Sequence, residues 1–412
     1  MTALKVLIAS SYYWPEGVGS APYLTGLAEH LSERGNDVVV ATGFAHYPDW
    51  RPSSHGRLAA RESHNGVTII RRWHYVPRTQ SAAHRAAYEL SLLAFGLTAL
   101  PVRWRPNVVV GTCPSLAGGV VAAAASARYR VPYGLVFQDL MGQAAEQSGV
   151  AGGARVAGIV RDVELSLARR ATAVGIIAEN FRHYLEAGGV PADRIERLRN
   201  WTRRIEPDET MEETRRRLGW TLDEFVCLHG GNMGQKQGLD NLLATAALLR
   251  GSGIRIALVG DGNDRPRLER EAAAQELANV DFVSLQGPGK WEAVMQAANI
   301  LLVNQRSSVT DMSLPSKLTS YFAAGRPVVA AASAASETAH EIHAAGAGLV
   351  VPPGQPEALR DAIFELRADP ERARRLGASG KEYAETTLSR AAALAQYDVF
   401  VSRLVRGRRA PG

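Results

Sequence analysis

Short apolar segments recur along the whole chain with helix-length segments between them. In the first half the predicted strands are residues 6–10, 37–42, 68–71, 107–111, 133–137 and 173–177. In the second half they are residues 226–229, 255–259, 280–284, 300–304, 328–331 and 348–351. Continuous runs rich in Val, Ile and Leu are typical of parallel sheets with helices on both faces. The pattern therefore predicts an α/β protein made of two doubly wound, Rossmann-like domains.

The boundary between these domains follows from a change in composition. We predict an N-terminal domain over residues 1–200 and a second domain over residues 201–388, with a polar, proline-containing hinge at 200–213. A last helix, residues 390–405 within the segment 389–412, is expected to pack back on the N-terminal domain. With 412 residues, 46% of them hydrophobic, the chain is large enough for two hydrophobic cores.

The segment richest in glycine, LHGGNMGQKQGL at residues 228–239, follows a predicted strand and precedes a predicted helix. Glycines at such a turn let the backbone approach a ligand, and the N–H groups at a helix start attract anions. Lys236 adds a mobile positive charge within the same turn. The alternative is an ordinary strand-to-helix turn that needs glycine only for tight packing.

A second turn of this kind lies in SLPSKLTSYFAAGRPVVAA, residues 313–331. Ser316 and Lys317 open a predicted amphipathic helix that ends at Gly325, so the helix start offers another anion site beside a lysine. Two lysine-bearing helix starts in one α/β domain suit a ligand with two linked phosphates. This arrangement indicates a nucleoside diphosphate group.

Composition narrows the class of protein further. The only cysteines, Cys113 and Cys227, lie in apolar contexts without disulfide or metal spacing, which is typical of a reducing cytoplasm. We recognise no signal peptide, and the longest apolar run, residues 90–102, is shorter than the ~20 residues of a membrane span. No Asp-x-Asp pair is present, so the sequence gives little support to metal-dependent sugar transfer.

The formal net charge of the chain is +6. The window of residues 57–105 has the same net charge, because it contains eight arginines and two glutamates (8 − 2 = +6). Aromatic residues are interleaved with these arginines, namely Trp73, Tyr75, Tyr88, Phe95 and Trp104. Arginines mixed with aromatic residues describe a surface that can lie on an anionic membrane. The alternative is a solvated basic face around a buried helix. Nucleic acid is not an expected partner, since no recognised nucleic-acid motif is present.

Several motifs resemble the GT-B glycosyltransferases of the large retaining family 4, above all the branch that builds bacterial capsule, O-antigen and colanic-acid units. The motifs are GGNMGQKQGL (230–239), VGDGND (259–264), LPSKLTSYFAAGRPVV (314–329), FAHYPDW (44–50) and PNVVVGTCPSLAGG (106–119). The resemblance covers nearly the whole chain. It implies a GT-B fold with two domains facing a cleft, a UDP- or GDP-linked sugar donor as substrate, and neither a metal nor a cofactor.

The resemblance also assigns roles residue by residue. Lys236 matches the family lysine that binds the donor diphosphate, and it is the expected catalytic cation. Two departures stand out, since Asn232 and Ser320 occupy positions where the family usually has an arginine and a ribose-binding glutamate. The residues assigned to the donor site are Gly17, Gly19, Gly231, Asn232, Gly234, Lys236, Leu285, Ser316, Lys317 and Leu318.

On the acceptor side, Asp139 in VFQDL matches a family aspartate near the acceptor, and His46 and Tyr47 are assigned to acceptor binding. We expect Asp139 to orient the acceptor more than to act as a base, because the leaving phosphate can itself take the proton. The alternative is that Asp139 caps the helix that follows it. Asp261 and Asp264 are expected to end a strand and cap the next helix, and Glu337 is a further candidate for contact with the donor sugar.

Together these features predict a retaining, metal-independent transferase that moves a sugar from a nucleotide donor to a glycan acceptor. The acceptor is expected to be linked to polyprenyl diphosphate or to be another glycan of cell-surface polysaccharide assembly. The expected location is the cytoplasm, peripherally on the inner face of the plasma membrane. Two alternatives stay open: a soluble transferase for a small natural product, and a nucleotide-sugar-binding protein without activity, suggested by Asn232 and Ser320.

Overall fold

The structure, a computed structural model, describes residues 3–78, 81–113, 115–142, 153–203, 205–307 and 316–407. The side chains of Ala82, residues 153–156, Lys236 and Ser316 lie outside this description. The chain divides into two compact units. The N-terminal unit comprises Met1–Asn200 and Ala391–Gly412, and the C-terminal unit comprises Trp201–Arg390.

The N-terminal unit is built on a sheet with the strand order β3-β4-β2-β1-β5-β6-β7-β8. All neighbouring strands are parallel except β3 and β4, which form an antiparallel pair at one edge. The strands are β1 (Lys5–Ala9), β2 (Asp37–Gly43), β3 (Ala59–His64), β4 (Val67–Arg72), β5 (Val108–Cys113), β6 (Tyr133–Phe137), β7 (Ala173–Ile176) and β8 (Ile195–Arg197).

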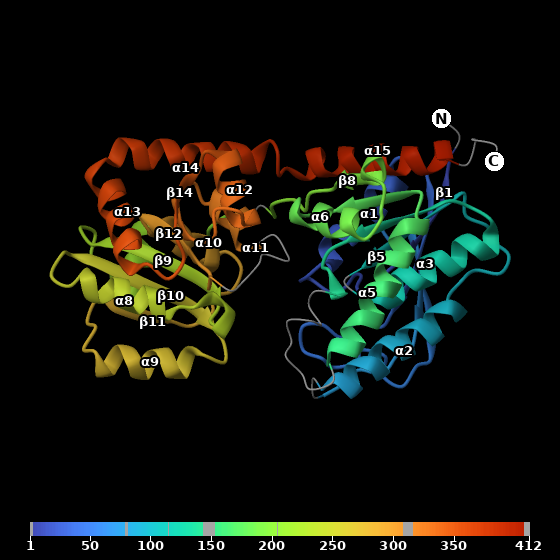
Figure 1. The fold of residues 1–412 in the computed structure, drawn as a ribbon, viewed down its shortest axis with the longest axis horizontal. Helices are drawn as coiled ribbons and strands as arrows, with labels where there is room; N and C mark the ends of the chain where they lie inside the picture. The colour runs from blue at the N-terminus through green and yellow to red at the C-terminus, as the bar shows by residue number, and fades with distance from the viewer. Residues whose placement is uncertain are drawn as a thin grey trace. The chain divides into compact units, whose positions relative to one another are not determined.

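Helices cover both faces of this sheet (Figure 1). They are α1 (Ala21–Glu33), α2 (Ala82–Thr98), α3 (Leu116–Tyr129), α5 (Gly153–Arg170), α6 (Asn180–Ala187), α15 (Arg390–Gly407) and the short 3₁₀ helix η1 (Ala192–Arg194). Alternate residues of the strands pack into two hydrophobic cores, one on each face of the sheet. Leu7 and Val109 pack with α3 and α5, whereas Ile8 and Val110 pack with α1 and α15. This alternation is the period of two that a strand buried on both faces requires.

The last helix, α15, packs on the sheet of the N-terminal unit. Its side chains Tyr397, Phe400 and Leu404 are buried in the same core as Val6 and Val38. Gly134 in β6 makes room for this helix, since a Cβ atom there would lie 2.6 Å from the ring of Phe400. The C-terminal segment therefore supplies part of the core of the N-terminal unit.

The C-terminal unit contains a second sheet, which is parallel throughout and has the order β11-β10-β9-β12-β13-β14. Its strands are β9 (Phe225–Asn232), β10 (Ile254–Asp261), β11 (Val280–Val283), β12 (Ile300–Asn304), β13 (Val328–Ala331) and β14 (Gly348–Val351). Its helices are α7 (Met211–Leu218), α8 (Asp240–Leu248), α9 (Arg265–Ala274), α10 (Lys290–Ala297), α11 (Ser316–Ala323), α12 (Glu337–Ala345), α13 (Pro356–Ala368) and α14 (Pro370–Glu385), with the 3₁₀ helix η2 (Gln235–Gln237).

Every strand predicted from an apolar run is present in the structure. The largest difference is at the end of β9, which continues through the glycines to Asn232. Two strands were not predicted, namely β3 and β8. In β3 the sequence AARESH is polar and at most half-buried, so it carries no apolar run, and β8 is only three residues long. In both units the turns that follow the parallel strands leave the same edge of the sheet, where ligands of doubly wound proteins bind.

Candidate functional site

The glycine-rich turn of the C-terminal unit lies at the carboxyl end of β9, the strand at the centre of its sheet. Gly231 has φ +108° and Gly238 has φ +60°, conformations that residues with a Cβ atom rarely adopt. A Cβ atom at Gly231 would have nothing within 4 Å, so its glycine is required by the backbone conformation and not by crowding. The turn thus leaves open space beside its own backbone.

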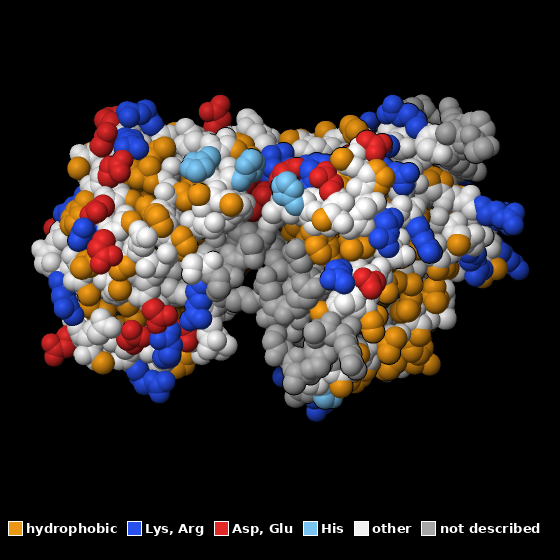
Figure 2. Space-filling view, in the orientation of Figure 1, with side chains coloured by type: hydrophobic (Ala, Val, Ile, Leu, Met, Phe, Trp, Pro, Cys, Tyr) orange, Lys and Arg blue, Asp and Glu red, His pale blue; other side chains and the backbone are white. Residues whose placement is uncertain are grey.

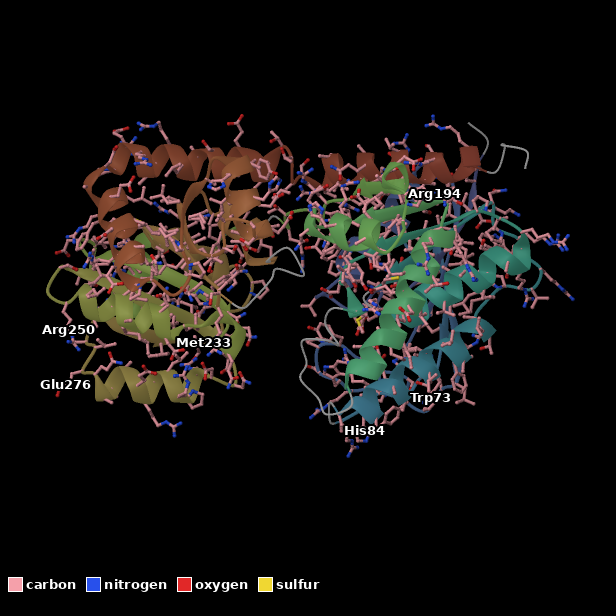
Figure 3. All side chains as sticks on the ribbon, in the orientation of Figure 1. Trp73, His84, Arg194, Met233, Arg250 and Glu276 are labelled. Atoms are coloured by element: carbon pink, nitrogen blue, oxygen red, sulfur yellow. The ribbon has the colours of Figure 1, made fainter. Side chains whose placement is uncertain are left out.

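The neighbouring motif, VGDGND at the end of β10, packs against this turn. A Cβ atom at Gly260 would lie 2.0 Å from the carbonyl oxygen of Gly231, and one at Gly262 would lie 2.4 Å from that of Met233. The two turns are joined by the backbone N–H of Met233, which donates to Asp261 O at 2.8 Å, and by that of Asp264, which donates to Met233 O at 3.0 Å. Met233, labelled in Figure 3, is fully buried at this junction.

The aspartates of VGDGND have structural partners. Asp261 ends β10 as expected, and its carboxylate accepts the backbone N–H of Gly262 at 2.8 Å. Asp264 stands at the start of α9 but forms no capping hydrogen bond with its side chain, which instead pairs with Arg267 at 2.7 Å. Asp264 therefore occupies the N-cap position as expected, but its carboxylate binds Arg267 and caps no backbone N–H group.

Asn304, at the end of β12, fixes the segment that contains Lys236. Its amide Nδ2 donates to the carbonyl oxygens of Gln237 at 2.7 Å and Gly238 at 2.8 Å, and its Oδ1 accepts from Asn241 at 2.7 Å. Asn304 is 1% exposed, so these bonds are made in the interior, where an unpaired carbonyl is costly. A single asparagine at a strand end carries no sequence signal, and for this reason it was missed.

The second predicted anion site, the start of α11, is tied to the first by one tyrosine. The hydroxyl of Tyr321 in α11 accepts the backbone N–H of Gly230 at 2.8 Å. Leu318 is buried in the core, and Lys317 is half-buried beside it. Burial lowers the pKa of the Lys317 ammonium to about 8, so this amine is mostly charged near neutral pH. The side chains of Lys236 and Ser316 lie outside the described residues, although their backbones belong to η2 and α11.

The remaining donor-site candidates of the C-terminal unit follow strands β9 and β11, whereas Gly17 and Gly19 lie in the N-terminal unit. Asn232 is exposed at the end of β9, and Gly234 follows within the same turn. Leu285 follows β11, two strands away, and is 70% exposed, which is unusual for a leucine. Gly231, Asn232 and Gly234 lie on one turn, and Tyr321 joins this turn to α11, the helix that contains Lys317 and Leu318.

His229 lies directly beneath this turn. It is fully buried, its Nδ1 lies 3.1 Å from the carbonyl oxygen of Leu302, and its Nε2 has no hydrogen-bond partner among the described residues. Burial, together with the charge of Lys317, holds the pKa of His229 well below its usual value. A neutral imidazole adds no further positive charge near Lys317.

In the N-terminal unit, the turns after β1 and β2 meet through the side chain of Glu16. Its Oε1 accepts the backbone N–H groups of His46 at 2.9 Å and Tyr47 at 3.0 Å, and its Oε2 accepts that of Tyr13 at 3.2 Å. Gly19 has φ +65°, and a Cβ atom there would lie 3.5 Å from the ring of Tyr47. Gly17, Gly19 and Tyr47 are all exposed on these two turns.

His46 faces the interior of the unit and not the solvent. Its Nε2 lies 3.0 Å from the hydroxyl of Tyr88, and its Nδ1 lies 3.1 Å from Phe44 O and 3.2 Å from Nε2 of His74. Burial lowers the pKa of His46 to about 4 and that of His74 to about 3. His46 is thus a neutral, hydrogen-bonded group that supports the turn carrying Tyr47.

Asp139 follows β6, whereas Tyr47 follows β2. Strands β1 and β5 lie between these two strands in the sheet, so the two residues are on different turns. The backbone N–H groups of Met141 and Gly142 donate to Glu164 at 2.8 and 3.3 Å, and no capping bond from Asp139 is found among the described residues. Asp139 is exposed to solvent, yet protein atoms around it remove enough hydration to raise its pKa to about 6. It is therefore ionised at neutral pH.

Three further features concern the candidate Glu337, metal ligands and membrane spans. Glu337 is 3% exposed at the first position of α12, so it belongs to the interior of the C-terminal unit. In the described ranges, no group of three or more His, Cys, Asp or Glu side chains is arranged to hold a metal ion. None of the helices in those ranges combines the length and the apolar character that crossing a bilayer requires.

Comparison with known proteins identifies the family. Residues 18–201 match the family described as "Glycosyl transferase 4-like domain", and residues 210–383 match "Glycosyl transferases group 1". The protein belongs to these group 1, GT4-like glycosyltransferases. It is 28% identical over 407 residues to the putative colanic acid biosynthesis glycosyl transferase WcaI of Escherichia coli K12, covering 96% of this chain and 98% of WcaI.

Solved structures show the same fold at low sequence identity. Sucrose-phosphate synthase of Thermosynechococcus elongatus matches with a TM-score of 0.71 and 20% identity, covering 98% of this chain and 100% of that one. HepE of Anabaena, solved in complex with UDP, matches with a TM-score of 0.68 and 17% identity, covering 97% and 100%. These likenesses confirm the GT-B fold expected from the sequence, and the family confirms that the protein is a glycosyltransferase.

Proposed function

We propose that this glycosyltransferase moves a sugar from a nucleoside-diphosphate donor to a lipid-linked or other glycan acceptor during cell-surface polysaccharide assembly. The observation that carries the proposal is the glycine turn of the C-terminal unit, where Gly231 leaves open space beside the backbone that leads to Lys236. WcaI is named for colanic acid biosynthesis, which supports an acceptor of this class. HepE has been solved with UDP and with UDP-glucose, so UDP-linked sugars are the first donors to test.

In this proposal the donor diphosphate is bound by backbone N–H groups of the glycine turn and of the start of α11. Lys236 and Lys317 add positive charge near the β-phosphate, on which negative charge develops as the sugar leaves. Fixed cations and N–H dipoles stabilise such a charge without reorganisation, which is an effective form of catalysis. No metal ion is needed for this step, and the departing phosphate can accept the proton of the acceptor hydroxyl.

The proposed acceptor side lies in the N-terminal unit. Tyr47 is 36% exposed and makes an edge contact with the ring of Trp50, so it offers an aromatic surface on which a sugar can pack. Asp139, ionised at neutral pH, can accept a hydrogen bond from an acceptor hydroxyl and so orient it. His46 contributes by supporting the Tyr47 turn from inside.

We further propose that the protein attaches to an anionic membrane through α2. Ala83, Ala86, Ala87, Leu90, Ala94 and Leu97 are exposed at helical spacing and form one continuous stripe, to which Val102 adds an exposed side chain. In Figure 2 hydrophobic side chains gather at the lower right of this unit, where Figure 1 places α2. A helix that is apolar on both its buried and its outward face has an unsatisfied surface in water.

Arginines of the window 57–105 would supply the positive charge for this attachment, but not all of them are exposed. Arg57, Arg61, Arg78, Arg103 and Arg105 are exposed. Arg71 is 3% exposed and is bound to Glu62 at 3.1 Å, so it supports the fold instead. The aromatic Trp73 packs edge-on against Phe95 of α2 at 5.1 Å and is labelled in Figure 3. An exposed apolar stripe in a window of the chain that also carries exposed arginines suits an anionic bilayer surface.

The donor is tested by a thermal-shift screen with UDP, GDP, TDP and ADP, followed by mass spectrometry of reactions with the matching sugar nucleotides. We expect one diphosphate to raise the melting temperature and its sugar nucleotide to be consumed, with the sugar found on a polyprenyl-diphosphate-linked glycan. A protein that no nucleoside diphosphate stabilises, and that consumes no sugar nucleotide, would overturn the proposal. Transfer to a small soluble molecule alone would overturn the proposed acceptor.

A further inference from the structure

Glu16 is a buried carboxylate placed beneath two exposed turns. Its side chain is 3% exposed, whereas Gly17, Val18 and Gly19 on one turn and Tyr47 on the other are exposed. A buried charge is retained in a protein only when hydrogen bonds replace its lost water. Here those bonds come from the backbone N–H groups of Tyr13, His46 and Tyr47, at 3.2, 2.9 and 3.0 Å.

These three bonds connect segments that are distant in the sequence. Tyr13 belongs to the turn after β1, and His46 and Tyr47 belong to the turn after β2. The backbone N–H of Glu16 donates to Tyr13 O at 3.2 Å, so the residue is itself fixed within the first turn. The Glu16 carboxylate therefore connects the second turn to the first.

The aromatic contacts above Glu16 depend on this connection. The ring of Tyr12 lies 5.4 Å from that of His46 and 5.8 Å from that of Tyr47, measured between ring centroids. Tyr47 also covers Gly19, where a Cβ atom would be 3.5 Å from its ring. If the two turns separated, Tyr47 would lose these neighbours, because each of them reaches it from the first turn.

We propose that Glu16 is a positioning residue that joins the turns after β1 and β2 and holds Tyr47 in the orientation that meets the acceptor. The inference rests on the proposed acceptor side of the enzyme. Glu16 does not touch the reacting atoms, since it is covered by the turns that it holds. Its effect is therefore on acceptor binding, while the glycine turn of the C-terminal unit keeps its own support from Asn304 and Tyr321.

Hydrogen–deuterium exchange tests the connection directly and needs no substrate. In Glu16→Ala the amides in peptides spanning residues 10–20 and 44–50 should exchange at least tenfold faster, since hydrogen bonds to a charged group are lost. Glu16→Gln keeps one oxygen that can accept from His46 and Tyr47 but puts an N–H group opposite Tyr13, so an intermediate increase is expected. Glu341→Gln is the matched control: Glu341 is 1% exposed in the C-terminal unit, where it accepts from Tyr383 at 3.0 Å.

A kinetic comparison separates positioning from general destabilisation. With UDP-glucose or the donor found in the screen, and a short-chain prenyl-diphosphate-linked hexose as the acceptor probe, Glu16→Gln should raise the acceptor KM at least fivefold. The thermal shift caused by the nucleotide should stay as in the wild type. Unchanged exchange in both peptides, or an acceptor KM equal to that of Glu341→Gln, would overturn the inference. Faster exchange in a protein that transfers no sugar would instead refute the proposed function alone.

Discussion

The glycine turn of the C-terminal unit depends on a few single residues for its conformation. Gly260 has φ +144°, and its missing side chain makes room for the carbonyl oxygen of Gly231. Asn304 then donates to the carbonyl oxygens of Gln237 and Gly238, which fixes the backbone that directly follows Lys236. The chemistry expected of Lys236 thus depends on residues that make no contact with the donor in our proposal.

Gly260→Ala should destabilise the protein and weaken nucleotide binding. A Cβ atom would lie 2.0 Å from Gly231 O, and the strained φ alone costs about 1–3 kcal/mol. Gly251→Ala is the control, because Gly251 also has a positive φ of +72° but nothing lies within 4 Å of its Cβ position. Urea unfolding and the thermal shift with UDP measure both effects. Equal losses in the two variants would show that the contact with Gly231 is unimportant.

The buried histidines should make the protein sensitive to mild acid. His46 and His74 have pKa values lowered to about 4 and about 3, so the unfolded chain takes up protons first as pH falls below about 6.5. The free energy of unfolding should therefore fall between pH 6.5 and 4, by roughly 3 kcal/mol for His46 alone. Urea unfolding at several pH values is the measurement.

The double variant His46→Gln and His74→Gln should lose less stability over this pH range than the wild type, whatever its stability at pH 7. His340→Gln serves as the control, because His340 is exposed on α12. A pH dependence that is the same in the double variant and in the wild type would contradict this account of the two buried rings.

At the scale of elements, the sequence predicted the strands and helices that have a regular pattern of apolar residues. Buried strands such as β1 and β12 carry apolar runs that no turn or surface helix mimics, so they were predicted almost to the residue. The glycine turn and the start of α11 were also predicted, because a lysine at a strand-to-helix turn is typical of a phosphate-binding segment. Glu16 and Asn304 were not, because their partners are backbone groups far away in the sequence. Only the folded chain brings those groups within hydrogen-bond distance.

The helix α2 should bind vesicles that contain anionic lipid. Each basic residue near an anionic surface contributes about 1 kcal/mol, and the attraction is screened beyond about 10 Å at 0.1 M salt. We expect sedimentation with phosphatidylglycerol vesicles, less with neutral vesicles, and release by added salt. Equal binding to neutral and anionic vesicles, or binding to neither, would contradict the proposed attachment.

The apolar stripe is tested separately from the charges. Leu90→Glu combined with Leu97→Glu should abolish vesicle binding, since these side chains are 65% and 39% exposed and their loss leaves the core intact. Leu248→Glu in α8 is the control, as Leu248 is an exposed leucine of the C-terminal unit. Vesicle binding that persists in the double variant would assign the attachment to another surface.

At the scale of the whole molecule, the two units share an α/β architecture but differ in the residues at the carboxyl edges of their sheets. The turns at the carboxyl edge of the N-terminal sheet present aromatic side chains held by a buried carboxylate, a surface suited to a sugar. The sequence of the glycine turn of the C-terminal unit contains Lys236, which suits the phosphate binding that we propose. A division of this kind fits an enzyme that must bind a charged donor and a sugar-bearing acceptor in one reaction.

Activity should survive treatment with EDTA. The sequence has no Asp-x-Asp pair, and two lysine-bearing helix starts can carry the charge of the diphosphate. The transfer rate of protein incubated with EDTA and then freed of it should match that of untreated protein within experimental error. A lost activity that Mg²⁺ or Mn²⁺ restores would assign part of this role to a metal ion.

The most direct test of the account is the turnover of Lys236→Ala. Removing this cation should lower the rate of sugar transfer roughly 10²–10³-fold, since the stabilisation of the departing diphosphate is lost. The circular dichroism spectrum should not change, and Lys290→Ala, an exposed lysine at the start of α10, should retain full activity. If Lys236→Ala transfers sugar within threefold of the wild-type rate with an unchanged spectrum, then the glycine turn is not the catalytic phosphate site and the account is wrong.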